Sequence, residues 1–207
     1  TADAEAVLRQ AVADMPGRIE AKLALASFLA ENDTAAAADT LRGFIAEGGA
    51  GATQLQLALG DIYAREGELD EAAEAYRAVS GSADKEGALL ARNQLARIAV
   101  KQGKSGEAAA MIEEILKADP KNADALASRA SIRIAARQTD AAIADLRQAL
   151  DENPRFVRAH VLLANAQLQN GAVELAKSSL VEALKLAQAY EPAATQLAGL
   201  LIREQRF

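Results

Sequence analysis

The sequence predicts an all-α fold, a solenoid of antiparallel helix hairpins, and three observations support it. Four alanines recur at intervals of 34 residues: Ala96, Ala130, Ala164 and Ala198. A second series keeps the same interval, with Ala108, Ala142 and Ala176 each followed four residues later by Ile112, Leu146 or Leu180. A period of 34 residues is typical of a two-helix unit repeated along a solenoid. Moreover, 51% of the residues are hydrophobic, and most of these are alanine and leucine, which favour helices.

Turn residues divide the chain of 207 residues into twelve expected helices. Glycine or proline marks the turns, as at Pro16-Gly17, Glu66-Gly67, Asp119-Pro120 and Asn170-Gly171. The expected helices span residues 2–14, 18–31, 34–47, 52–66, 69–80, 85–102, 105–118, 122–136, 139–152, 156–169, 173–187 and 191–205. Paired in order, they form full repeats over about 18–51, 52–87, 88–122, 123–156 and 157–190, between half repeats 1–17 and 191–207. Because the core of a solenoid runs along its length, we expect a single domain over residues 1–207.

Each expected helix carries the residues that its place in a hairpin requires. First helices carry leucine before a small residue, at Leu25-Ala26, Leu59-Gly60, Leu95-Ala96, Leu163-Ala164 and Leu197-Ala198, with Arg129-Ala130 as the exception. Second helices carry alanine four residues before a large apolar residue, as in Ala72 and Tyr76. Small residues suit positions where two helices cross closely. The first expected helix, with Ala4 and Leu8, has the pattern of a second helix.

Two irregularities interrupt the period. From Gly60 to Ala96 the interval is 36 residues, so we expect a two-residue insertion in the turn-rich stretch Ser80-Gly81-Ser82-Ala83-Asp84. In the first complete hairpin the large apolar residue Leu41 comes one residue early, and Arg42 occupies its expected place. The glycine-rich stretch from Glu47 to Gly51 follows, and the period has recovered by Gly60.

The clearest unit identifies a family resemblance. Leu59-Gly60-Asp61-Ile62-Tyr63, then Gly67, Ala72 and Tyr76, resembles the repeat motif of the tetratricopeptide repeat family. The resemblance extends over nearly the whole chain. It implies a right-handed superhelical solenoid whose first helices line an inner groove, and a non-enzymatic role in holding segments of other proteins.

Motifs for other chemistry are missing or incomplete. Lys104-Ser105 follows Gly103 as in a phosphate-binding loop, but Ile98 stands where that motif needs its first glycine. His160 is the single histidine and there is no cysteine, so we expect no metal site, no cofactor and no catalytic group. The net charge of −6 disfavours nucleic acid, and no apolar run is long enough to insert in a membrane.

The resemblance places the candidate binding residues on the inner faces of the first helices. Early inner positions include Leu23, Ser27, Glu31 and Asp61, so the early wall is acidic and the later wall mostly basic. The expected peptide-binding residues are Arg65, Asn93, Arg97, Lys101, Arg158 and Asn165. We expect an extended or helical acidic segment of another protein, with Asn93 and Asn165 hydrogen-bonded to its backbone. Some family members hold a C-terminal carboxylate with a lysine and an asparagine one turn apart. No hairpin here has that pair at the corresponding sites, and the nearest is Asn93 with Arg97, so we do not expect recognition of chaperone tails.

Arg129 and Arg133 stand where the family motif carries leucine and tyrosine. One interpretation, which we favour, is that they reach solvent or pair with nearby acids such as Asp140 and Asp145. The other is that they belong to the basic wall of the groove.

An alternative function is a structural arm of a larger bacterial cell-envelope or polysaccharide-export assembly, with contacts through the convex face or the ends. The alanine-rich composition is typical of bacterial proteins. Both ends fall inside a repeat, so we expect a fragment of a longer protein, either cytoplasmic or periplasmic. The apolar face of the last helix, formed by Leu197, Leu200 and Leu201, is expected to self-associate.

Overall fold

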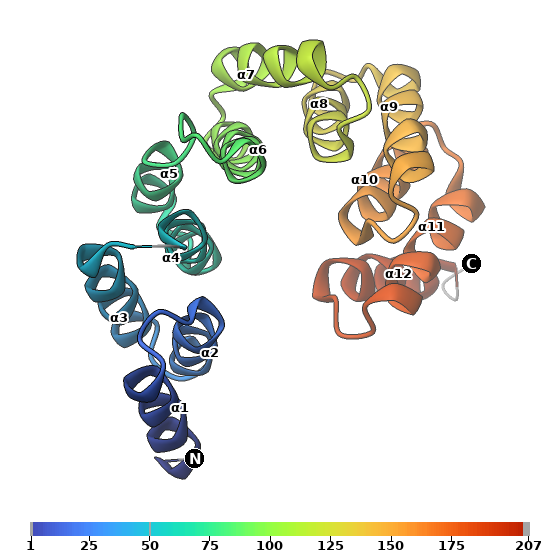
Figure 1. The fold of residues 1–207 in the computed structure, drawn as a ribbon. Coiled ribbons are helices and arrows are strands. Elements are labelled where there is room, and N and C mark those ends of the chain that lie inside the picture. Colours follow the sequence, from blue (N-terminus) through green and yellow to red (C-terminus); the bar gives the residue numbers. More distant parts are fainter. Residues whose placement is uncertain (1, 50, 205–207) are drawn as a thin grey trace. The chain divides into compact units, whose positions relative to one another are not determined.

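The computed structural model describes residues 2–49 and 51–204, and in these ranges all regular secondary structure is helical (Figure 1). The helices are α1 Ala2–Asp14, α2 Ile19–Ala30, α3 Thr34–Glu47, α4 Ala52–Glu66, α5 Leu69–Arg77, α6 Lys85–Lys101, α7 Ser105–Ala118, α8 Ala123–Ala135, α9 Thr139–Glu152, α10 Val157–Gln169, α11 Val173–Leu186 and α12 Glu191–Glu204. They confirm the all-α hairpin fold, with most ends within two residues of the expected ones. The exception is α5, which ends three residues early.

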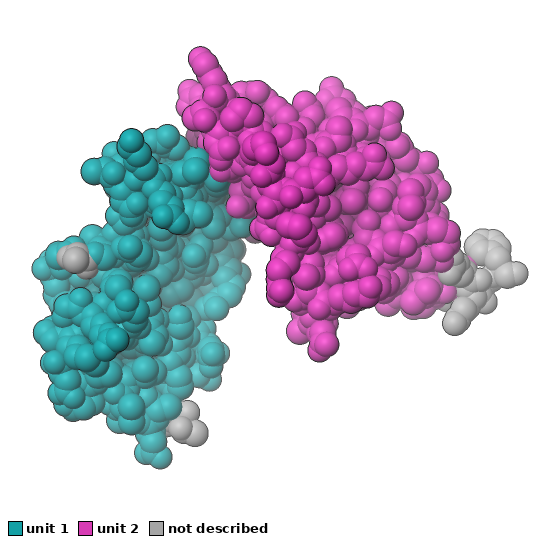
Figure 2. Space-filling model, turned by 45° about the vertical axis from the view of Figure 1, so that its right-hand side comes forward, with its two compact units in different colours: residues 1–98 teal, residues 99–207 magenta. Residues whose placement is uncertain are grey.

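The chain forms two compact units, Thr1–Ile98 and Ala99–Phe207 (Figure 2). The first unit holds α1 to α5 and most of α6, and the second holds the end of α6 and α7 to α12. From α1 to α5 and from α7 to α12, each helix packs against the next one, and the successive first helices α2 and α4, and α8 and α10, also pack together. The expectation of one continuous solenoid over residues 1–207 stays a prediction.

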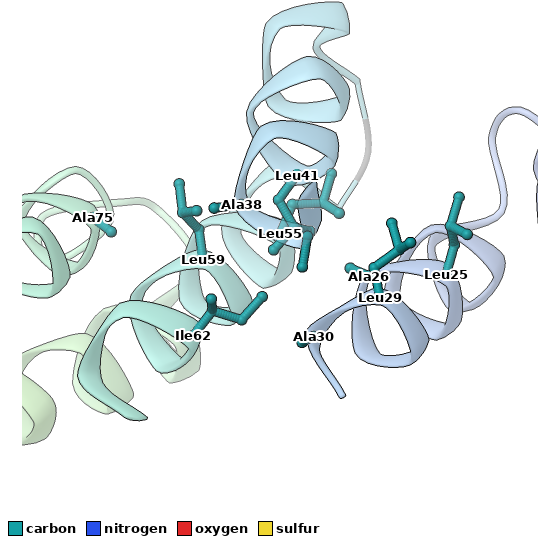
Figure 3. Packing of buried hydrophobic residues seen from close by; sticks show 11 residues of the cluster. Leu25, Ala26, Leu29, Ala30, Ala38, Leu41, Leu55, Leu59, Ile62 and Ala75 are labelled. Carbon is teal, nitrogen blue, oxygen red and sulfur yellow. The ribbon is translucent and has the colours of Figure 1, made fainter. Parts of the chain in front are cut away.

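The core of the first unit joins α2, α3, α4 and α5 through leucine and alanine (Figure 3). Leu41 of α3 is fully buried in it, whereas Arg42 is exposed. The cap of α3 begins that helix at Thr34, since the Asp33 side chain accepts a hydrogen bond from the Ala36 nitrogen at 2.9 Å. The early position of Leu41 in the sequence thus reflects a real one-residue shift of α3 relative to α2.

The link between α5 and α6 takes up the two-residue insertion. It covers residues 78–84 and is a series of turns. Arg92 of α6 donates through Nε to the Ser80 carbonyl at 2.9 Å, and Asp84 accepts from the Gly87 nitrogen at 3.1 Å. Buried Tyr76, Val79 and Ala91 then join the two helices. The insertion therefore lies where the turn-rich sequence predicts it.

The core of the second unit repeats one arrangement twice. In α8, α9 and α10, Ala130 packs with Ala142 and Leu146, all fully buried. In α10 and α11, Ala164 packs with Ala176 and Leu180 in the same way. Methyl side chains let these helices approach closely, so a larger residue would force them apart.

The last helix only partly matches the expected apolar face. Leu197 and Leu200 of α12 pack against the core formed by α10 and α11. Leu201 is exposed, and so is its neighbour Ile202. The uncovered part of α12 is therefore smaller than the face predicted from the sequence.

Candidate protein-binding surface

The first unit has a pocket between the first helices α2 and α4. Its volume is about 390 Å³. The lining residues are Leu23, Ala26, Ser27, Ala30, Glu31, Ala58, Asp61, Ile62 and Arg65. Five of them, Leu23, Ser27, Glu31, Asp61 and Arg65, are positions that the repeat register assigns to the inner face. The pocket carries two carboxylates and one guanidinium, which fits the acidic early wall.

Arg65 contributes to this pocket but also ties two repeats together. Its Nη2 donates to the carbonyl of Ala30, at the end of α2, at 3.0 Å. Its Nε lies 3.8 Å from a carboxylate oxygen of Glu66, and the side chain is still half exposed. The structure therefore gives Arg65 a structural contact that the sequence did not reveal.

Asn93 of α6 is buried in the first unit, with 8% of its surface exposed. Among the residues that the structure describes, its Oδ1 has no hydrogen-bond partner. A buried acceptor without a donor costs free energy, so such atoms are uncommon in folded proteins. The oxygen itself is covered by the protein.

Asp61 of α4 anchors a polar network beside this position. It accepts from the hydroxyl of buried Tyr76 at 2.6 Å and from Nε2 of Gln94 at 3.3 Å. Burial, together with the hydrogen bond to Asp61, raises the pKa of Tyr76 well above its ordinary range, and the charge of Arg97 offsets a small part of this shift. Asp61 and Arg97 thus lie near the same hydroxyl group.

Arg97 and Lys101 lie one turn apart on α6 and share one face of that helix. Arg97 is half-buried and Lys101 is exposed. Within residues 2–49 and 51–204, neither side chain forms a hydrogen bond or an ion pair with the protein itself. Both cationic groups are therefore available to an acidic ligand.

The second unit contains Arg158 and Asn165, two turns apart on α10. Arg158 donates through Nη2 to the hydroxyl of Ser128 at 3.1 Å, and Ser128 is buried in α8. Asn165 is half-buried. In the same unit, Nε2 of Gln169 donates to the carbonyl of Ile134 at 3.2 Å, in the arrangement that Arg65 has with Ala30. The structure thus groups Arg65, Asn93 and Arg97 in the first unit, and Lys101, Arg158 and Asn165 in the second.

Arg129 and Arg133 do not belong to a basic wall. Arg129 binds the buried carboxylate of Asp145 with two hydrogen bonds, from Nη2 at 2.8 Å and Nε at 3.1 Å. Arg133 donates to the same carboxylate at 2.6 Å, and Glu113 accepts from Arg129 at 3.2 Å. The hydrogen bond to Asp145 is the main cause that raises the pKa of Arg129. Pairing with Asp145 is confirmed, and the alternative placement in the groove wall is wrong.

Metal sites and membrane-spanning helices are absent from the described residues. No group of three or more histidine, cysteine, aspartate and glutamate side chains there is arranged to hold a metal ion. None of the helices in that part combines the length and apolar character needed to cross a membrane.

Comparison with known proteins identifies the family. Two tetratricopeptide repeat models match the chain, one over residues 26–85 and 93–138 and the other over residues 133–201. This chain belongs to the tetratricopeptide repeat family. No curated protein sequence matches it.

Solved structures share the fold at low identity. One chain in the crystal structure of the APC/C hetero-tetramer Cut9–Hcn1 is 16% identical with a TM-score of 0.74; the match covers 96% of this chain but 39% of that one. TTC0263 from Thermus thermophilus is 19% identical with a TM-score of 0.72, and the match covers 89% of this chain and 100% of that one. The first repeat domain of Spaghetti (RPAP3), bound to the HSP90 peptide SRMEEVD, is 23% identical with a TM-score of 0.51; the match covers 56% of this chain and 93% of that one. At such identities the similarity shows the fold alone.

Proposed function

We propose that this chain is a non-enzymatic scaffold that binds an acidic segment of another protein on the inner faces of its first helices. The observation that carries the proposal is the pair Arg97 and Lys101, two cations one turn apart on α6 that form no hydrogen bond or ion pair within the described residues. Cations on an otherwise acidic protein with a net charge of −6 attract carboxylates locally and speed their approach.

Asn93 has the complementary role of binding the backbone of the segment. Its carboxamide lies one turn before Arg97 on α6, and its oxygen has no donor in the described structure. A backbone N–H of the ligand satisfies this acceptor once the amide turns, and the buried group then no longer carries an unmade hydrogen bond. In the second unit Asn165 has the same role on α10, two turns after Arg158.

The pocket between α2 and α4 takes a side chain of the bound segment. Its carboxylates, Glu31 and Asp61, favour a polar or basic residue at that point, whereas Arg97 and Lys101 favour acidic residues next to α6. A solved structure of similar fold is bound to a peptide, SRMEEVD of HSP90, which supports a peptide as the kind of ligand.

A binding experiment with defined probes tests the proposal. Fluorescence anisotropy compares a labelled short peptide rich in aspartate and glutamate with the same peptide carrying lysine at those positions. We expect the acidic peptide to bind more tightly, and to bind more weakly as salt rises, because salt screens charges beyond roughly 8–10 Å. The double variant Arg97→Glu, Lys101→Glu should lose about 0.4–2 kcal/mol of binding free energy, or roughly 2- to 30-fold in Kd.

A matched variant controls for net charge. Arg77→Glu, Lys117→Glu makes the same change on exposed positions of the second helices α5 and α7 and should bind like the unsubstituted chain. Equal losses in both variants, or equal binding of the two peptides, would contradict the proposed site. If binding of a native partner survives the change on α6 and is lost when the second helices are altered, the structural-arm alternative is correct.

A further inference from the structure

A second pocket of the first unit lies between the second helices α3 and α5 and has a volume of about 520 Å³. Residues of α3, α4 and α5 line it, and none of them lines the pocket between α2 and α4. Its apolar lining includes Ile45, Leu59 and Ala75, of which Leu59 and Ala75 are buried. Ligand sites usually have volumes of about 300–1,000 Å³, so this pocket has room for a large side chain.

The charged part of this lining is mostly acidic. Glu71 and Glu74 lie three residues apart on α5 and so share one face of that helix. Within residues 2–49 and 51–204, neither carboxylate forms a hydrogen bond or an ion pair. Arg42, the cation in the lining, is held by Asp39 at 3.1 Å and by the hydroxyl of Tyr63 at 3.0 Å. The two carboxylates of the pocket are therefore without a paired cation in this part of the chain.

The second unit shows which groups fill the equivalent place when the chain itself supplies them. There α7, α8 and α9 pack in sequence as α3, α4 and α5 do in the first unit. The repeat register gives these equivalent residues: Arg129 for Leu59, Arg133 for Tyr63, Asp145 for Ala75 and Glu113 for Arg42. Arg129 donates to Asp145 at 2.8 Å and to Glu113 at 3.2 Å, and Arg133 donates to Asp145 at 2.6 Å. Two guanidinium groups and two carboxylates thus occupy the place that is a pocket in the first unit.

An arginine side chain entering the pocket gives the first unit the same set of charges. Its guanidinium has donors for both Glu71 and Glu74, and Arg42 is the second guanidinium of the set. The methylene groups of the arginine suit the apolar lining at Leu59 and Ile45. The pocket therefore matches arginine in charge and in apolar contact.

We propose that the pocket bounded by α3, α4 and α5 binds an arginine side chain from a basic segment of another protein. Arginine is enriched among the residues that dominate binding at protein interfaces, which agrees with a pocket that pairs its charge and covers its stem. The site is separate from the surface proposed for an acidic segment, because Arg97 and Lys101 take no part in the pocket. The chain then has two binding surfaces of opposite preference.

An NMR titration with a defined probe tests the site. The probe is a short blocked peptide of glycine and serine with one arginine, compared with the same peptide carrying citrulline, which keeps the shape of arginine without its charge. Backbone signals of α3, α4 and α5 around the pocket should shift with the arginine peptide and not with the citrulline peptide. The double variant Glu71→Gln, Glu74→Gln should raise the Kd of the arginine peptide about 2- to 30-fold. Ala46→Phe places a ring in the pocket, keeps both carboxylates and should raise this Kd as well.

Controls separate the pocket from net charge and from misfolding. Glu86→Gln, Glu114→Gln makes the same change of charge at exposed positions of α6 and α7 and should bind the arginine peptide like the unsubstituted chain. Glu71, Glu74 and Ala46 are exposed, so helical circular dichroism should be unchanged in their variants, as should binding of the acidic peptide. No binding of the arginine peptide, or equal binding of the citrulline peptide, overturns the proposal. Equal losses in the two double variants, or no loss in Ala46→Phe, overturn it too and assign the binding to the general acidity of the surface.

Discussion

At the scale of single residues, Gly60 of α4 packs directly against the ring of Tyr76 of α5. A Cβ atom built on Gly60 would lie 2.6 Å from Cε1 of the Tyr76 ring. The ring is fully buried, and its hydroxyl is held by Asp61, so it cannot move aside without breaking that hydrogen bond. Glycine is required here because any side chain would overlap the ring.

Gly60→Ala should therefore lower the free energy of unfolding by about 1–3 kcal/mol, the usual cost of overpacking a core. Urea unfolding followed by circular dichroism measures it. Gly43→Ala is the matched control, because Gly43 lies in α3 with open space around its Cβ position. Alanine there should be neutral or should stabilise by up to about 1 kcal/mol. Equal effects in the two variants would show that the contact with Tyr76 carries no energetic weight.

The sequence predicts which helices carry the candidate binding residues but does not determine the depth or the contacts of these side chains. Arg65 and Arg158 donate to groups 35 and 30 residues away, in the preceding repeat. Such contacts depend on how repeats stack, and spacing within one helix carries no information about them. Asn93 lies at an inner position yet is buried, because the side chains packed around α6 decide its exposure. The pairing with Asp145 was predicted, since an acid in the second helix faces two arginines in the first.

At the scale of helices, Asp145 links α8 to α9 through Arg129 and Arg133. The carboxylate is buried and accepts from both guanidinium groups, which are themselves only about one quarter exposed. A buried charge contributes stability only when it is paired and hydrogen-bonded, and removal of one partner leaves the others uncompensated.

Asp145→Ala should lower the free energy of unfolding by about 1–3 kcal/mol, a value below that for fully buried ion pairs because the arginines can reach water. Thermal and urea unfolding measure the loss. Asp151→Ala removes an exposed acid from the same helix and should change stability by no more than about 0.5 kcal/mol. If Asp145→Ala also costs no more than about 0.5 kcal/mol, water satisfies the two arginines as well as Asp145 does.

The order of the helices and most of their ends were predictable, because the turn residues and the 34-residue period are two independent signals in the sequence. The end of α5 was not. The sequence continues with Ala78 and Val79, which suit a helix, but turns begin there and the Ser80 nitrogen donates back to Tyr76. The structure then buries Val79 against α6, so tertiary packing overrides the helical preference of these two residues.

At the scale of the whole molecule, each apolar cluster involves only helices that are close in sequence. Leu41 belongs to a cluster of the first unit, and Leu180 belongs to one formed by α10, α11 and α12. In repeat proteins of this kind, each repeat is stabilised by its neighbours, and local opening is possible without global unfolding.

Leu180→Ala should remove about 2–5 kcal/mol of local stability, as is usual for a buried leucine. Hydrogen exchange measured by mass spectrometry should then be faster in α10, α11 and α12, while α2, α3 and α4 keep their protection. Leu175→Ala, an exposed change in the same helix, should leave exchange unaltered throughout. A uniform loss of protection along the chain would show that it unfolds as one cooperative unit.

The side chains that close the ends of the first helices also bear on how the protein is made. The carbonyls of Ala30 and Ile134 receive their donors from Arg65 and Gln169, each 35 residues later in the chain. At ribosomal rates of about 5–20 residues per second, this delay is roughly 2–7 s. During that interval, a newly made first helix has an end that only water can satisfy, and it is completed when its successor emerges. Assembly of the nascent chain is therefore expected to advance one repeat behind synthesis, in the direction of translation.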